Sequence, residues 1–180
     1  MFTQFETPRL IVRRLQLEDA QEVYEGWGQD PVVTQYLSWS VHQSIDDTLA
    51  FLRHADHAWK QGSGHLPFGL QSKETGKLIG GIGYGIEARC RAQIGYALMQ
   101  EAWGHGFASE ALEGLIQQIW QTFPEVYRIY GMCHETHYAS AGVMLKVGME
   151  KEGVFKRYYL LPNISPTVPC DMAVYALTKS

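Results

Sequence analysis

Several features are scarce in this chain of 180 residues, and each scarcity argues against a class of protein. No apolar run approaches the roughly 18 residues of a transmembrane helix, and the initial MFTQFETPRL lacks the basic and apolar regions of a signal peptide. The cysteines, Cys90, Cys133 and Cys170, are too few and too widely spaced to indicate a disulfide framework or a zinc knuckle. We therefore expect a cytoplasmic protein without a membrane partner.

Positive charge is also in short supply. The chain has 15 Lys and Arg against 19 Asp and Glu, which gives a formal net charge of −4. A nucleic-acid-binding protein would be expected to carry a basic face, so no nucleic-acid partner is expected. The length is that of a single domain, residues 1–180, and suffices to bury a core without disulfides.

Common nucleotide and metal motifs are missing from the sequence. Gly76-Lys77 is not a P-loop, because Gln71 stands where the first Gly is required and Leu78 where Ser or Thr is required. The glycines between residues 81 and 85 do not have the dinucleotide spacing, and no helix follows them. The pairs His54/His57 and His134/His137 do not form convincing ligand sets, so no metal is expected.

Glycine, in contrast, is abundant, with 18 of the 180 residues, and it punctuates a regular series of predicted elements. Alternating or compact apolar runs predict strands over residues 9–13, 67–72, 77–86, 92–99, 127–133, 153–161 and 171–177. Apolar residues at helical spacing predict helices over residues 18–27, 44–61, 108–122 and 139–147. This order predicts an α/β (α+β) chain, with helices on both faces of a mixed sheet of about seven strands.

The glycine pair Gly104 and Gly106 lies between a predicted strand and the longest apolar-faced helix. Two glycines let the backbone turn tightly and approach a ligand closely. The N–H groups of residues 105–109 would converge with the positive end of the helix dipole, which suits a phosphate. A plain tight turn between a strand and a helix is the alternative interpretation.

The segment around this turn resembles the acetyl-CoA loop of the GNAT superfamily of N-acetyltransferases. The family pattern, (Gln/Arg)-x-x-Gly-x-(Gly/Ala), falls on Glu101-Ala-Trp-Gly104-His-Gly106. More narrowly, the chain resembles the RimJ/RimL branch of ribosomal-protein N-terminal acetyltransferases nearly end to end. The matching residues include Thr7-x-Arg9-Leu-x-Val-Arg13, Ile94-Gly-Tyr96, Trp103-Gly-x-Gly-Phe-Ala-x-Glu-Ala111 and Ser140-x-x-Val143-x-x-Lys146-x-Gly148.

The resemblance implies a GNAT fold, with a mostly antiparallel sheet that splays between two middle strands, and acetyl-CoA as co-substrate. In this family the pyrophosphate lies on the glycine turn and the pantetheine arm pairs with the strand before it. The residues carried over as cofactor-binding are Ala97, Leu98, Met99, Trp103, Gly104, His105, Gly106, Phe107, Ala108, Ser109, His137, Ser140 and Lys146.

The resemblance also implies direct attack of a primary amine on the thioester through a tetrahedral intermediate. The catalytic candidates are the Leu98 N–H as oxyanion donor, Ser140 as acid or hydrogen-bond donor to the sulfur, and His137. The chain departs from relatives at three positions. Met144 replaces the Tyr acid of many superfamily members, Gln93 replaces a common Glu, and His137 replaces an Asn. A bound water, His137 or His134 therefore remain candidates for the general base.

The acceptor side is predicted from aromatic residues in the region that lines the acceptor pocket in relatives. Trp27, Tyr36 and Trp39 are expected to contact the acceptor, with Asp30, Asp46 and Asp47 adding negative charge, whereas core packing is the preferred interpretation of Trp59. The acceptor is expected to be either a protein N-terminal α-amine or a small amine, and the protein a monomer or a homodimer. A non-catalytic CoA-binding module and an unrelated nucleotide-binding protein are the alternatives.

Overall fold

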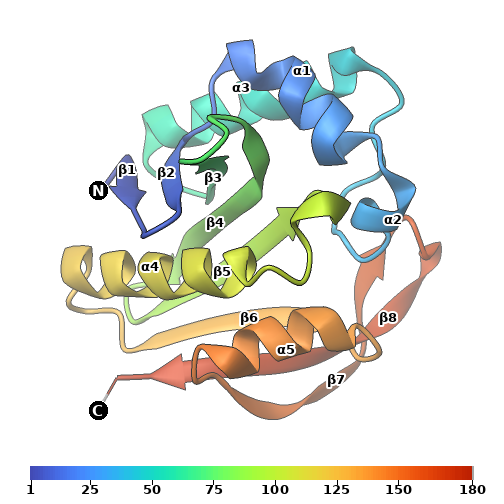
Figure 1. Cartoon of the computed structure of the whole chain (residues 1–180). Helices are drawn as coiled ribbons and strands as arrows, with labels where there is room; N and C mark the ends of the chain where they lie inside the picture. Colours follow the sequence, from blue (N-terminus) through green and yellow to red (C-terminus); the bar gives the residue numbers. More distant parts are fainter. Residues whose placement is uncertain (180) are drawn as a thin grey trace.

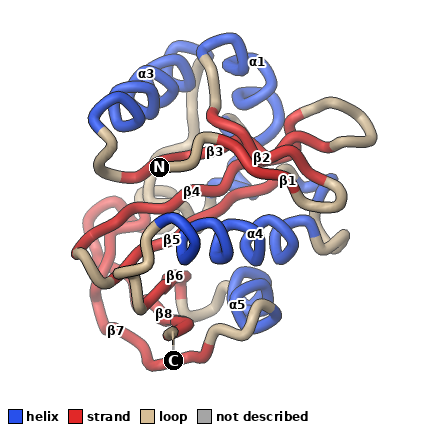
Figure 2. Tube along the Cα trace, turned by 90° about the vertical axis from the view of Figure 1, so that its left-hand side faces the viewer, coloured by secondary structure: helices blue, strands red, loops and turns tan. Residues whose placement is uncertain are grey.

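The computed structural model describes residues 1–179, which form one eight-stranded sheet covered by helices. The strand order is β1-β2-β3-β4-β5-β6-β8-β7. All neighbours are antiparallel except β5 and β6, which are parallel (Figures 1 and 2). The strands are β1 (Gln4–Glu6), β2 (Leu10–Arg14), β3 (His65–Ser72), β4 (Leu78–Ala88), β5 (Arg91–Leu98), β6 (Arg128–His134), β7 (Glu150–Leu161) and β8 (Ser165–Thr178). The prediction of about seven strands thus missed the short β1.

The N-terminal helices differ from the prediction in detail. The single helix expected over residues 18–27 is a 3-10 turn η1 (Leu17–Asp19), an α-helical turn α1 (Ala20–Val23) and a π-turn η2 (Tyr24–Gly28). A further short helix, α2 (Pro31–Thr34), was not predicted. Helix α3 (Ile45–Gln61) begins with a reciprocal capping box between Ser44 and Asp47 and ends at Gly62, as the sequence indicated.

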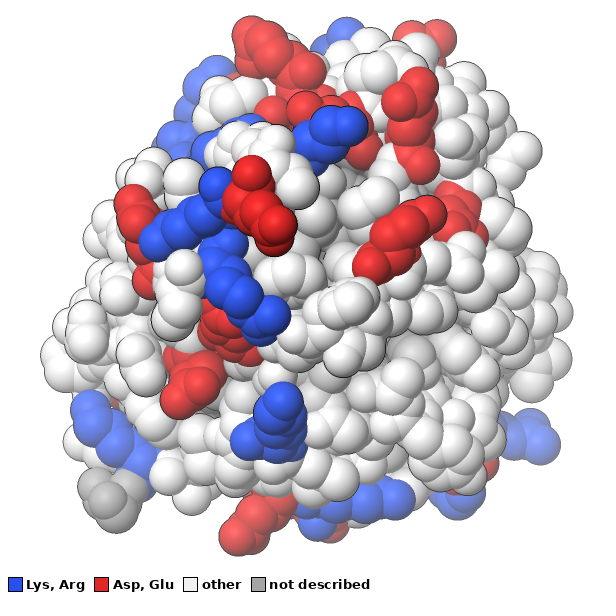
Figure 3. Space-filling model, in the orientation of Figure 1, with Lys and Arg blue, Asp and Glu red and all other residues white. Residues whose placement is uncertain are grey.

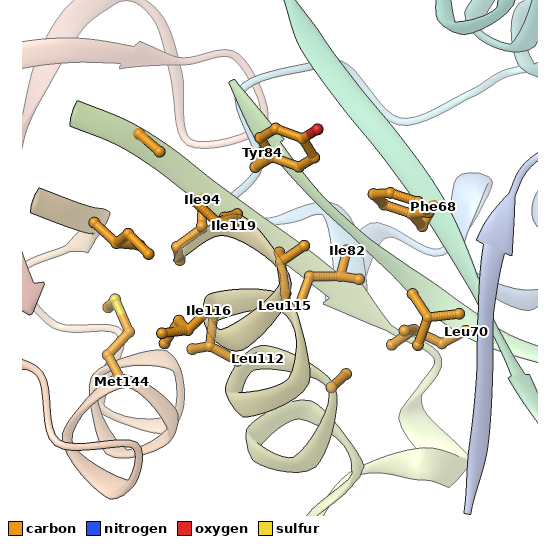
Figure 4. Close-up of a cluster of buried hydrophobic side chains, with 14 of the residues drawn as sticks. Phe68, Leu70, Ile82, Tyr84, Ile94, Leu112, Leu115, Ile116, Ile119 and Met144 are labelled. Carbon is orange, nitrogen blue, oxygen red and sulfur yellow. The ribbon is translucent and has the colours of Figure 1, made fainter. Parts of the chain in front are cut away.

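Helix α4 (Phe107–Thr122) provides much of the core on one face of the sheet. Its residues Leu112, Leu115, Ile116 and Ile119 are at most 4% exposed. Figure 4 shows these side chains directed at strand residues that include Ile82 and Ile94. Burying side chains of this size stabilises the fold by about 1.5–3 kcal/mol each. Helix α5 (Tyr138–Lys146) adds the buried Met144 to the same cluster.

The other face of the sheet is covered by the N-terminal helices. A second cluster joins Val23, Trp27 and Leu52 of these helices to Leu15 and Leu78. The prediction of helices on both faces is therefore confirmed. None of the helices within residues 1–179 has the length and hydropathy required to cross a membrane.

The sheet opens between β5 and β6, in the middle of the strand order. These two strands pair from Arg91 with Arg128 to Ile94 with Gly131. The second half of β5, residues 95–98, continues beyond this pairing while it remains paired with β4 on its other side. The predicted splay is therefore present, and it exposes main-chain groups at the end of β5.

Candidate active site

The glycine turn predicted from the sequence lies directly before α4. Gly104 and Gly106 have φ angles of +76° and +80°, a left-handed conformation that favours glycine. The first hydrogen bond of the helix runs from the Glu110 N–H to the Gly106 carbonyl, so the N–H groups of residues 107–109 precede it. A Cβ at Gly104 would enter open space, which leaves room for a ligand against this backbone. These features fit the phosphates of CoA.

Two basic side chains flank the same turn. Arg9 Nη2 and Lys146 Nζ lie 3.6 and 3.7 Å from where a Cβ of Gly106 would stand. Arg9 is held by Glu110, whose carboxylate accepts its Nε at 2.6 Å, and by the carbonyl oxygen of His105 at 3.0 Å. Cations beside backbone donors complement a phosphate group. Lys146 was predicted here, whereas the part played by Arg9 was not.

The main chain at Leu98 faces the opening between β5 and β6. The Met99 N–H donates to the Ile79 carbonyl at 3.0 Å, toward β4. Because successive residues of a strand direct their N–H groups to opposite edges, the N–H of Leu98 is directed toward the opening. The Leu98 carbonyl, in the next peptide along the chain, accepts a hydrogen bond from the indole N–H of Trp103 at 2.7 Å, which holds the backbone directly after this N–H. The orientation suits the oxyanion donor predicted at Leu98.

Across the opening, the side chain of Tyr96 contacts the first turn of α5. Its hydroxyl lies 2.9 Å from both the carbonyl oxygen and the side-chain oxygen of Ser140. Burial raises the pKa of Tyr96, so its phenol stays protonated near neutral pH. Burial likewise raises the pKa of the nearby Cys133 thiol to about 11, although its hydrogen bond with Ser140 opposes the shift. Cys133 is therefore an unreactive thiol.

His137 is the N-cap residue of α5, and its carbonyl oxygen accepts the N–H of Ala141 one turn later. Its ring stacks on Tyr36, with the ring centroids 4.3 Å apart. Burial and the adjacent His134 both lower the pKa of His137, so its imidazole is neutral at pH 7. His134 tilts against the same Tyr36 ring at 5.4 Å. His137 can therefore accept a proton or a hydrogen bond at this position.

A cavity of about 790 Å³ joins these features. The cavity is lined by residues on both faces of the sheet, so it passes through the opening between β5 and β6. Fourteen of the predicted site residues line it: Trp27, Tyr36, Trp39, Ala97, Leu98, Trp103, Gly104, Gly106, Phe107, Ala108, Ser109, His137, Ser140 and Lys146. Met99 and His105 lie outside this lining, and His105 lines a neighbouring hollow beside Arg9.

The residues predicted to contact the acceptor differ in how far they are exposed to the cavity. Tyr36 and Trp39 are half-buried at the cavity, whereas Trp27 is only 3% exposed and packs mainly in the core. Asp30 and Asp47 cap helices α2 and α3 rather than line the cavity. Trp59 belongs to the core, as expected, and its indole N–H donates to the Pro67 carbonyl.

Four residues of the site escaped the sequence analysis as individual candidates: Arg9, His65, Tyr96 and Asn163. Tyr96 and Arg9 lie within matched motifs, but their contacts are with residues far away in the sequence. Tyr96 contacts Ser140, 44 positions away, and Arg9 contacts His105, 96 positions away. His65 lines the cavity from β3. Asn163 bonds three main-chain groups of the segment that carries Tyr36 and Trp39. No local pattern reveals such contacts.

Comparisons with known proteins agree with this geometry. Residues 9–150 match the family described as the acetyltransferase (GNAT) domain. An uncharacterized N-acetyltransferase of Bacillus subtilis, YoaA, is 30% identical over 99% of this chain and 98% of its own length. A GNAT-family acetyltransferase structure from Bacillus anthracis has a TM-score of 0.83 at 24% identity, covering 98% of both chains. RimL, a ribosomal L7/L12 acetyltransferase solved with CoA, has a TM-score of 0.82 at 19% identity, covering 96% of this chain and 95% of that one.

The chain belongs to the GNAT family of acetyltransferases. It is an acetyl-CoA-dependent N-acetyltransferase with the fold that RimL shares.

Proposed function

We propose that this protein acetylates a primary amine by direct attack on acetyl-CoA, with Ser140 assisting departure of the sulfur. The observation that carries the proposal is the convergence on one opening of the Leu98 N–H, the Ser140 hydroxyl and the glycine turn before α4. Bound acetyl-CoA would supply an acetyl group activated as a thioester. The remaining requirements of the reaction are that the chain binds and orients the two substrates and transfers protons.

Each group has a separate role. The N–H groups at the start of α4, with Arg9 and Lys146, bind the phosphates, and the exposed main chain of residues 97–98 orients the pantetheine arm. The Leu98 N–H donates to the carbonyl oxygen on which negative charge develops. His137, neutral at pH 7, accepts the proton that the attacking amine loses, directly or through a water.

Ser140 is arranged to donate a hydrogen bond toward the sulfur. The Tyr96 phenol donates its single hydrogen to the Ser140 carbonyl oxygen or to Oγ, both at 2.9 Å, and when Oγ accepts it the serine hydroxyl hydrogen is free to point into the opening. The serine keeps its hydrogen and stabilises the departing thiolate through a hydrogen bond, because a thiolate is a much weaker base than an alkoxide. Met144 cannot fill this role, because a thioether carries no proton and the residue is 1% exposed in the core.

The test is release of free thiol from acetyl-CoA with a panel of primary amines, together with mass spectrometry of the amine product. We expect amine-dependent release, and we expect Ser140→Ala to lower kcat by about 10–100-fold. That is less than many general acids contribute, because a thiolate leaves readily. Ser63→Ala, in an exposed position after α3, is the matched control and should retain full activity. Tight acetyl-CoA binding without any acetylated amine would instead identify a non-catalytic CoA-binding module.

A further inference from the structure

From the part of the cavity on the N-terminal helix side of the sheet, we infer the chemical class of the acceptor. The structure assigns it as a primary amine carried by an uncharged apolar or aromatic group, rather than a polyamine or an aminoglycoside. This inference rests on the proposed function, because it concerns the second substrate of the same reaction.

The floor of this part of the cavity is formed largely by glycines, with the His65 ring over Gly83. Gly81, Gly83 and Gly95 lie on one face of β4 and β5, and the register places Gly81 beside Ala97 and Gly83 beside Gly95. Pro67 of β3 lies beside Gly83 on the same face. A Cβ at Gly95 would meet only the His65 ring, at 3.9 Å, whereas a Cβ at Gly83 would lie 2.5 Å from Nε2 of that ring, so the open part of the floor is at Gly95. The result is a flat apolar platform that suits an aromatic or alkyl group.

The walls above the platform are aromatic and aliphatic. Trp39 stacks against Phe51 with centroids 6.4 Å apart, and Tyr36 faces the His137 ring. Leu15, Leu161 and Met172 complete the lining from other elements. An apolar group of the acceptor would lose its contacts with water here, which favours binding.

Acidic side chains are missing from this lining. Among residues 1–179, no Asp or Glu lines the cavity, and its polar side chains include His65, Gln93 and His137. The acidic residues nearest in sequence are used elsewhere: Asp30 caps α2 and accepts from Gln100, and Asp47 caps α3. On the face shown in Figure 3, charged side chains of both signs are scattered and the lower right carries few of them. A second ammonium group would be desolvated without a compensating carboxylate, which weakens its binding.

The aromatic walls are held in place by the turn between β7 and β8. The Asn163 amide nitrogen donates to the carbonyls of Thr34 and Trp39 at 2.7 and 2.9 Å, and its oxygen accepts the Val41 N–H at 3.0 Å. These three bonds pin both ends of the segment that carries Tyr36 and Trp39. The pocket is thus formed before the acceptor arrives, which favours a rigid apolar group over a flexible chain.

The test compares amines that differ in one charge. Isothermal titration of the CoA-loaded protein with hexylamine and 1,6-diaminohexane isolates the cost of the second ammonium group. Phenethylamine tests the preference for an aromatic ring, and the tripeptides Phe-Ala-Ala and Lys-Ala-Ala test the same chemistry in a peptide. We expect hexylamine and phenethylamine to bind at least tenfold more tightly than the diamine. Equal or tighter binding of the diamine, or no binding of the apolar amines, would overturn the inference.

A pair of glycine variants locates the binding. Gly95→Val should fill the platform and weaken phenethylamine binding at least tenfold without changing CoA affinity. Gly153→Val, on the edge strand β7 with no heavy atom within 4 Å of its would-be Cβ, is the control. If Gly95→Val unfolds, Trp39→Ala provides the same readout from the opposite wall. Phenethylamine binding that neither Gly95→Val nor Trp39→Ala weakens would contradict the assignment.

The outcomes separate the inference from the proposed function. Selective binding of apolar amines without acetyl transfer would support the acceptor class and refute the reaction. Acetyl transfer that favours diaminohexane would support the reaction and refute the acceptor class. If Phe-Ala-Ala is preferred over Lys-Ala-Ala, and hexylamine over 1,6-diaminohexane, the apolar group is recognised whether it belongs to a peptide or to a small molecule.

Discussion

The hydroxyl of Tyr96 lies 2.9 Å from the side-chain oxygen of Ser140 and joins the end of β5 to the start of α5. Helix α5 follows β6, the strand that separates from β5 where the sheet opens. The contact therefore spans the opening and holds Ser140 beside it.

Tyr96→Phe removes this contact and keeps the ring. We expect kcat to fall about tenfold with a smaller change in the KM for acetyl-CoA, because Ser140 loses its orientation but the phosphate site is untouched. The loss of a hydrogen bond should lower the free energy of unfolding by about 1 kcal/mol. Tyr130→Phe is the control, since the Tyr130 hydroxyl donates to Glu87 at the surface. Unchanged kcat in Tyr96→Phe would show that Ser140 needs no support.

Lys146→Gln tests the phosphate site. The Lys146 ammonium lies beside Gly106, so its loss should weaken CoA binding about 5–20-fold while kcat at saturation stays near that of the wild type. The effect should diminish at high salt, because the interaction is between charges. Calorimetry at low and high salt measures both, with the exposed Lys77→Gln as control. Equal losses in the two variants would argue against a specific contact.

Gly106→Ala tests whether the left-handed turn is required. At a φ of +80° an alanine costs about 1–2 kcal/mol of stability, and its Cβ would also approach Arg9 and Lys146. We expect lower thermal stability and at least tenfold weaker CoA binding. Gly64→Ala has a similar φ of +83° but no atoms within 4 Å, so it should lower stability alone. If both variants bind CoA like the wild type, the turn does not contact the cofactor.

The pH dependence of kcat tests His137. Burial and His134 lower its pKa, so the imidazole remains in its neutral, proton-accepting form to a pH below the ordinary value of about 6.5. With saturating amine, kcat should therefore rise with pH through a pKa below that value and then level off. His137→Gln should remove this limb and lower the plateau. If the rise of kcat with pH persists unchanged in His137→Gln, the titrating group is not His137. The pH profile of His65→Gln would then test the other histidine that lines the cavity.

Cys133→Ala tests direct transfer against an acetyl-enzyme route. Burial raises the pKa of this thiol to about 11, so little thiolate exists near neutral pH. We expect the variant to retain most of the kcat and the wild type to show sequential rather than ping-pong kinetics. Radiolabel retained on the wild-type protein after acetyl-CoA treatment, and lost in Cys133→Ala, would contradict this expectation.

The features that could be predicted from sequence are those encoded locally. The Ser44 capping box, the Gly62 stop and the Gly104–Gly106 turn involve residues within a few positions of one another, and each is present. Helix α2 also had a local signal that was not used, since Asp30 caps the helix and Pro31 occupies its first turn. The N-terminal part of β8 was missed because Pro166 and Pro169 indicate a loop, although this hairpin arm accommodates both within the strand.

The contacts that complete the site are tertiary and have no local signature. The Tyr96–Ser140 contact and the Asn163 bonds depend on how β5, α5 and the β7–β8 turn meet. Two of the three acidic residues expected near the acceptor, Asp30 and Asp47, serve as helix caps instead, which sequence proximity could not reveal. The glycine excess was partly explained from sequence through the turn, but the platform formed by Gly81, Gly83 and Gly95 emerges only from strand register.

The most direct test of the account is the rate of acetyl transfer to phenethylamine by the wild-type protein and by Ser140→Ala, followed through thiol release and the mass of the product. We predict stoichiometric N-acetylphenethylamine and free CoA from the wild type, with kcat about 10–100-fold lower in the variant because the sulfur leaves without a hydrogen-bond donor. Equal rates in the two proteins would contradict the role of Ser140. The absence of acetylated amine from the wild type, despite bound acetyl-CoA, would contradict the reaction itself.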